Sequence, residues 1–122
     1  MTNYEKKLVS VFSLFIRNRD RHLGCISCGC FVMFCKFEDG HYIQRGNHAL
    51  KFNEWNNNGQ CHWCNSMLNG NHEAYRERLI KKIGIEKVEW LESQKNVIYQ
   101  MKLWEIKELL SHYQQELKKL GI

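Results

Sequence analysis

Two cysteine pairs with the same spacing constrain this chain more than any other feature. Cys25 and Cys28 form one CxxC pair, Cys61 and Cys64 form a second, and residues 29–60 separate the two. Two such turns supply four thiolates, the donor set of a closed tetrahedral zinc site. Four soft ligands with no open position make a structural ion, whose binding is typically worth about 10–16 kcal/mol. The sequence therefore predicts one structural Zn²⁺ per chain.

The expected cellular compartment favours metal binding by the cysteines over disulfide formation. The chain has no run of about 20 apolar residues that would cross a membrane, and its first residues lack the apolar stretch of a signal peptide. We therefore expect a cytoplasmic protein without a membrane partner, in which clustered cysteines bind metal. A thiol redox protein, with one CxxC pair free of metal, is the alternative. Cys30 and Cys35 are predicted to be small buried strand residues rather than ligands.

Length and charge set the class of the protein and of its partner. The 122 residues fit a single domain, 1–122, whose small core makes a metal staple plausible. The formal net charge of +5 favours an acidic partner, of which nucleic acid is the commonest, although a basic protein without such a partner is an equal alternative.

The spacing of apolar residues predicts the secondary-structure elements of the first half of the chain. Residues 4–18 carry apolar side chains at helical spacing and predict an amphipathic helix. Residues 30–43 predict a β-hairpin, with an apolar first strand and a turn at Glu38–Gly40. Residues 44–60, rich in Asn and Gly, are predicted to be a loop.

Beyond Asn65 the pattern is helical, and Gly84 and the stretch 93–96 are predicted to divide three helices. Each CxxC turn is a zinc knuckle. The order of knuckle, hairpin, knuckle and helix along the chain predicts an α+β treble-clef fold stapled by zinc. We expect an N-terminal helix and basic segment (1–23), a zinc-bound core (24–76) and a helical C-terminal arm (77–122).

Three polar residues lie where a treble clef would bring them together: His41, Asn56 and Asn65. Hydrolysis of a phosphodiester needs a base to activate water and a divalent cation to neutralise charge. A histidine suits the first role, and Asn or Asp oxygens suit magnesium. Each residue also has an ordinary interpretation: a surface histidine, an asparagine in a turn, and a helix cap.

The chain resembles the NinG (Rap) recombination endonucleases of lambdoid phages. The matching segments cover roughly residues 12–92. They are Phe15-Ile-Arg-Asn-Arg-Asp20, Cys25-Ile-Ser-Cys28, Gly40-His-Tyr-Ile-Gln-Arg45, Lys51-Phe-Asn-Glu-Trp-Asn56, Gln60-Cys-His-Trp-Cys-Asn65 and Gly70-Asn71 with Tyr75. The arrangement of knuckle and Cys-Asn is also similar to that of phage endonuclease VII, a Holliday-junction resolvase.

The resemblance implies an HNH, or His-Me finger (ββα-metal), nuclease that cuts branched DNA in recombination, such as Holliday junctions and D-loops, and a phage or prophage protein in a bacterial host. It makes His41 the general base, Asn65 a ligand of a catalytic Mg²⁺ or Mn²⁺, and Asn56 the middle residue of the triad. Endonuclease VII-like sites have an Asp directly before the histidine, where this chain has Gly40. Asp39 is therefore the tentative acidic ligand.

Three further residues are weighed for the catalytic site. Asp20 and Glu54 are alternatives to Asp39 as the acidic ligand, and His72 is a candidate for the far side of the site.

Basic residues near the knuckles are predicted to hold DNA phosphates, which position a strand without reading its bases. The predicted DNA-binding residues are Arg17, Arg19, Arg21, Arg45, His48 and Lys51. Arg45 is also the predicted catalytic contact to the transition state, because it lies nearest His41 in sequence. For any one of these residues a solvated surface charge is the alternative.

The C-terminal helix, predicted from about residue 97 to 120, carries a heptad seam. The apolar residues of the seam follow spacings of four and three and are Tyr99, Leu103, Ile106, Leu110, Tyr113, Leu117 and Leu120. The seam could pack on the chain's own first helix or on a second subunit. We expect a homodimer through this helix, because a symmetric junction needs two opposed cuts.

One rival function belongs to a different class. A zinc-dependent DNA-binding module without catalysis would share the knuckles and the basic charge, and Gly40 in place of an acidic ligand favours it. The two functions differ in whether the candidate catalytic side chains share one open cleft.

Overall fold

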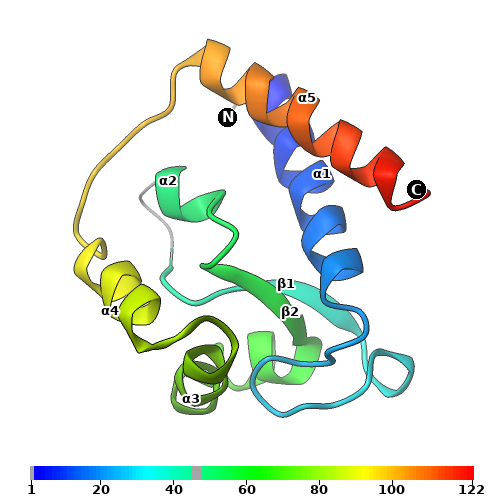
Figure 1. Cartoon of the computed structure of the whole chain (residues 1–122), viewed down its shortest axis with the longest axis vertical. Coiled ribbons are helices and arrows are strands. Elements are labelled where there is room, and N and C mark those ends of the chain that lie inside the picture. Colours follow the sequence, from blue (N-terminus) through cyan, green and yellow to red (C-terminus); the bar gives the residue numbers. More distant parts are fainter. Residues whose placement is uncertain (1, 45–47) are drawn as a thin grey trace.

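Two long helices at opposite ends of the chain pack side by side in this computed structural model, which describes residues 2–44 and 48–122. Helix α1 spans Asn3–Arg19, where residues 4–18 were predicted, and α5 spans Leu103–Lys119. Figure 1 shows the two lying together on one side of the sheet. Phe12 of α1 meets Tyr113 of α5 edge to face, with ring centroids 4.8 Å apart, and such pairs add to the apolar burial.

The sheet has two antiparallel strands, β1 (Phe37–His41) and β2 (Asn57–Cys61). Their register pairs Phe37 with Cys61 and His41 with Asn57. The predicted hairpin over residues 30–43 is therefore wrong: its supposed turn, Glu38–Gly40, lies inside β1.

The apolar run before β1 misled the strand prediction. A short 3-10 helix, Val32–Phe34, replaces the expected strand, and Phe31, Met33 and Phe34 are all exposed. Because these side chains are not buried against a core, the run does not behave as the buried strand that its hydrophobicity suggested. Cys30 and Cys35 are accordingly half-buried loop residues, not buried strand residues.

The segment predicted as a loop, 44–60, instead supplies a short helix, α2 (His48–Lys51), and strand β2. Asn57 and Asn58 are buried, and their amides donate to backbone carbonyls of residues 51–55. Buried polar groups are tolerated when they are hydrogen-bonded, so a polar sequence can form an inner strand.

Two further helices, α3 (His72–Ile83) and α4 (Ile85–Ser93), lie on the side of the sheet away from α1 and α5 (Figure 1). They bury a second apolar cluster, which contains Leu79 and Val88. Gly84 separates them with φ of +93°, a conformation that favours glycine, so the predicted boundary is confirmed. The chain is thus a mixed α+β structure with a small antiparallel sheet.

The heptad seam of α5 is used largely within the chain. Its buried members, which pack in the same cluster as the apolar face of α1, are Ile106, Leu110, Tyr113 and Leu117. Tyr99, Leu103 and Leu120 remain exposed, and α5 begins at Leu103 rather than near residue 97. The predicted C-terminal arm is therefore divided between the two ends of the molecule. A homodimer stays a prediction.

Within the described ranges, none of the helices combines the length and the apolarity that a membrane span requires.

Candidate metal centre and adjoining cleft

The four cysteines of the CxxC pairs converge at the centre of the fold. The sulfur atoms of Cys25, Cys28, Cys61 and Cys64 all lie within 4.8 Å of one another, and those of Cys28 and Cys61 are 3.8 Å apart. A tetrahedral ion with bonds of about 2.3 Å to sulfur needs sulfur atoms about 3.8 Å apart. The four thiols are thus positioned to hold a metal ion.

Backbone N–H groups of both knuckles point at the sulfurs. Ser27 and Cys28 each donate to Cys25 Sγ at 3.4 Å, and Cys64 donates to Cys61 Sγ at 3.4 Å. Although burial acts to raise the pKa of Cys25, the backbone N–H donors around it hold that pKa below its ordinary value. The first turn therefore favours the thiolate form of Cys25, the form that binds metal, whereas burial raises the pKa values of Cys61 and Cys64 in the second turn.

Cys30 and Cys35 pack against this cluster but do not belong to it. The Cys35 thiol donates to the carbonyl of Phe31 at 3.2 Å. Burial raises the pKa of Cys35 to about 12. Neither residue belongs to the group of four sulfurs close enough to share an ion, which agrees with the prediction that they are not ligands.

A cleft of about 440 Å³ adjoins the metal centre on the α1 side of the sheet. Its lining residues are Val9, Asp39, His41, Ile43, Gln44, Lys51 and Asn65. Four residues predicted from sequence thus meet in one open site: Asp39, His41, Lys51 and Asn65.

Strand β1 brings the carboxylate and the imidazole together. Asp39 and His41 are two residues apart on a strand, so their side chains leave from the same face. Burial raises the pKa of Asp39 to about 7, against the opposing charge of Arg19. Asp39 Oδ1 is buried without a hydrogen-bond partner among the described residues, an arrangement that is costly unless a ligand or ion satisfies it.

Asn65 is oriented by a residue that the sequence analysis missed. It lies in a π-helical turn, Trp63–Met67, directly after Cys64 rather than in the first turn of a regular helix. Its Nδ2 donates to Glu38 Oε1 at 3.0 Å, and the second oxygen of Glu38 contacts His62 Nδ1 at 2.9 Å. With its amide nitrogen committed, Asn65 can offer Oδ1 to the cleft. No pattern in the sequence marks Glu38, because its role depends on the strand register.

Asn56 does not line the cleft, unlike its predicted partners. It is fully buried, accepts from the Ile43 amide at 2.8 Å, and donates to the carbonyls of Ile43 and Leu50 at 3.0 Å each. These bonds fix the chain immediately after His41. The prediction that His41, Asn56 and Asn65 converge is therefore wrong for Asn56. This residue instead hydrogen-bonds to the backbone just after the histidine.

Gly40 is a glycine for a steric reason. A Cβ at this position would lie 2.1 Å from Gln60 Oε1. Gln60 cannot easily move, because its amide donates to Ser27 Oγ at 2.8 Å and to the Gly70 carbonyl at 2.7 Å. An aspartate directly before His41 is excluded by this packing, and Asp39 is the carboxylate that reaches the cleft.

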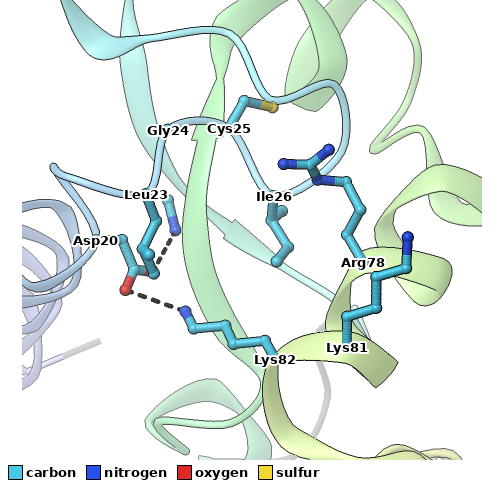
Figure 2. Close-up of a pocket in the computed structure, with 9 residues that line it drawn as sticks. Asp20, Leu23, Gly24, Cys25, Ile26, Arg78, Lys81 and Lys82 are labelled. Carbon is cyan, nitrogen blue, oxygen red and sulfur yellow. Dashed lines mark hydrogen bonds and ion pairs between the residues drawn. The ribbon is translucent and has the colours of Figure 1, made fainter.

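The other acidic candidates are committed elsewhere. Asp20 is buried and bonds to Arg19, to the Gly59 amide and to Lys82, as Figure 2 shows for Lys82. Glu54 accepts from the hydroxyl of Tyr113 at 2.8 Å. His72 lines a separate pocket with Tyr42 and Glu92, away from the cleft.

Two of the predicted phosphate contacts are instead held inside the fold. Arg19 binds Asp20 at 2.8 Å and donates to the Asn57 carbonyl at 2.8 Å. His48 contacts Glu5 at 2.7 Å through Nε2 and accepts from the Met101 amide through Nδ1.

The remaining predicted phosphate contacts are divided. Lys51 lines the cleft, whereas Arg17 and Arg21 line a separate shallow groove near the end of α1. Arg45 lies outside the described residues, so its predicted contact stays a prediction.

Comparison with known proteins gives a consistent family. The family profile described as Bacteriophage Lambda NinG protein matches residues 1–121. The chain is 40% identical over 116 residues to "Protein ninG" of Escherichia phage lambda, covering 94% of this chain and 56% of that protein. It is 38% identical over 119 residues to "Protein ninG" of Salmonella phage P22, covering 94% and 56%. The chain thus spans about half the length of these relatives. No solved structure matches it.

Proposed function

The chain belongs to the NinG family of bacteriophage proteins, and from that premise we propose that it is a metal-dependent endonuclease acting on branched DNA. Its substrates are recombination intermediates such as Holliday junctions, in the cytoplasm of the bacterial host. The observation that carries the proposal is the meeting of Asp39, His41 and Asn65 in one open cleft beside the four-cysteine centre. A module that only binds DNA has no need of such a convergence.

The proposal assigns zinc to the four-cysteine centre. Four cysteine sulfurs within 4.8 Å of one another, with N–H groups directed at them, match the four-thiolate environment that this ion prefers. No ligand position is left for substrate, so the role is structural. The two strands and the helical turn around this centre support a treble-clef core of the HNH type.

The second metal would be Mg²⁺ or Mn²⁺, held by Asp39 and Asn65. The buried, unpartnered Asp39 Oδ1 and the amide oxygen of Asn65 are the hard oxygen donors that such an ion selects. The ion would neutralise charge on the scissile phosphate and on the leaving oxygen. The donor set therefore fits a catalytic cation.

His41 is the general base of the proposal. It lies at the end of β1 and lines the cleft with the two oxygen donors, and Asn56 holds the backbone that follows it. There it can accept the proton of the attacking water. Lys51, on the same cleft wall, can bind a flanking phosphate and position the strand.

Asn65→Ala should leave the protein folded and zinc-loaded but raise the magnesium concentration needed for cleavage at least tenfold. The amide oxygen would be lost from the catalytic ion, whereas the thiols would be untouched. The measurement is junction cleavage as a function of magnesium concentration. Glu38→Ala should show a weaker form of the same shift, because Glu38 only orients Asn65.

Ser66→Ala is the matched control for this series, because Ser66 is exposed on the same turn and does not line the cleft. Its titration should overlay the wild-type curve. A wild-type titration for Asn65→Ala would mean that Asn65 has only a local structural role.

A further inference from the structure

A second pocket, of about 330 Å³, lies between the first knuckle, the end of α1 and helix α3. It shares no lining residue with the catalytic cleft. The knuckle backbone at residues 24–26 forms one wall, and three cationic side chains of α3 form another (Figure 2). Its volume is at the small end of the range for ligand sites, large enough for a phosphate with its sugar.

The three cations come from one face of a helix. Arg78, Lys81 and Lys82 follow spacings of three and four, which place side chains on the same side of an α-helix. Lys82 turns towards the end of α1, where it pairs with Asp20 at 3.0 Å. Arg78 and Lys81 are exposed and have no ion pair or hydrogen bond with any residue that the structure describes.

The knuckle is shaped to receive the guanidinium of Arg78. A Cβ on Gly29 would lie 3.1 Å from an Arg78 nitrogen, so the glycine leaves room for the side chain to extend along the loop. The guanidinium lies against this loop as a planar group that can bind two oxygens of one phosphate.

The charge around the pocket is positive. The single carboxylate of Asp20 is shared by two cations, Arg19 and Lys82, so it does not neutralise Arg78 or Lys81. When Arg19, which pairs with Asp20, is counted with the three cations of α3, one positive charge remains after subtraction of Asp20 and of the net negative charge of a divalent ion held by four thiolates. An anion is therefore the ligand class that the pocket favours.

We propose that this pocket binds a backbone phosphate of a DNA strand other than the one in the catalytic cleft. The inference rests on the proposed function and deepens it. Because the cleft and the pocket have separate walls, one branched molecule can engage both with different strands. Two linked contacts strengthen binding far more than either alone, and a linear duplex that engages only the cleft lacks this gain. The pocket would thus contribute to selectivity for branched substrates.

The test is the double substitution Arg78→Ala with Lys81→Ala, compared with wild type in DNA binding without magnesium. We expect the Kd for a four-way junction to rise about 10–100-fold, because two charged contacts to phosphate are lost. The Kd for a linear duplex should rise much less. The dependence of log K on log salt should become less steep by about 1–2 for the junction.

Lys6→Ala with Lys7→Ala is the matched control, because it removes the same charge from exposed positions at the opposite end of α1. This variant should bind both DNAs with nearly wild-type Kd and salt dependence. An equal loss in the control would mean that net charge, not the pocket, is responsible, and the proposal would fail.

Two further results would overturn the pocket. One is a double variant that keeps the wild-type Kd for junctions. The other is a double variant that loses zinc while Lys81→Ala alone binds junctions normally, which would mean that Arg78 serves the thiolate centre. Cleavage by wild-type protein is measured separately. If the double variant selectively loses junction binding but the wild-type protein does not cleave, the proposed phosphate pocket stands and the proposed endonuclease activity is rejected.

Discussion

His41→Ala should abolish cleavage of junction DNA and leave junction binding nearly unchanged. His41 lies in the cleft with Asp39 and Asn65, where it can take the proton of the attacking water. Removal of a general base typically costs about 10²–10⁴ in rate. Binding depends on phosphate contacts elsewhere, so the Kd should change little. Gel-shift and cleavage assays on one preparation measure both quantities.

His112→Ala is the matched control, because His112 is exposed on α5 and does not line the cleft. It should cut and bind as wild type does. If His41→Ala also cuts at the wild-type rate, His41 has no part in the chemistry. If it loses binding and cleavage together, the imidazole is needed for the fold or for DNA contact instead.

Cys61→Ser should remove the structural ion and unfold most of residues 24–70. Cys61 is buried, its sulfur lies within 4.8 Å of the three other thiols of the centre, and it stands at the end of β2. Zinc binding at such sites is worth about 10–16 kcal/mol, as much as the entire stability of an ordinary domain. Zinc analysis, together with amide hydrogen exchange, measures both effects. Exchange should accelerate first in β1 and β2.

Cys35→Ser provides the comparison within the same region. Cys35 is half-buried beside the thiol centre but is not one of its four members. We expect one zinc per chain and slow exchange in this variant. A folded Cys61→Ser protein with protected strands and no metal would show that packing alone holds the core.

The metal centre could be predicted from sequence because its signal is local. A CxxC turn places two sulfurs on one side of a short loop whatever the surrounding fold, and only the meeting of the two pairs needed the structure. The long helices α1 and α5 were also predictable, since each carries an apolar stripe. The surface that buries each stripe was not predictable, because periodicity does not identify the partner of a heptad seam.

The sheet was mispredicted because hydrophobicity and burial diverge in this chain. The apolar run 30–35 remains largely at the surface, while Asn57 and Asn58 are buried in β2. The amide nitrogens of these asparagines donate tertiary hydrogen bonds, to residues 51–55 and to Tyr75, although Asn57 Oδ1 has no partner among the described residues. Single-sequence patterns report local periodicity and miss such compensation.

Residues of the candidate site could be predicted where their chemistry alone indicated a role. They were missed where the role depends on tertiary contacts. His41, Asp39 and Asn65 follow from the chemistry of hydrolysis and from the resemblance, and they share the cleft. The role of Glu38 depends on the strand register. Arg19 resembles a free basic residue in sequence, yet buried partners hold its side chain.

Metal-dependent cleavage by the wild-type protein is the decisive measurement of whether the chain is an endonuclease. Zinc-loaded protein is incubated with end-labelled four-way junction and with linear duplex of the same sequence, with magnesium, with manganese and with neither. The expected result is strand cuts near the branch point that require the added ion, with far less cutting of the linear duplex. Intact DNA under all three conditions, with junction binding retained, would contradict it and identify the protein as a zinc-dependent DNA-binding module.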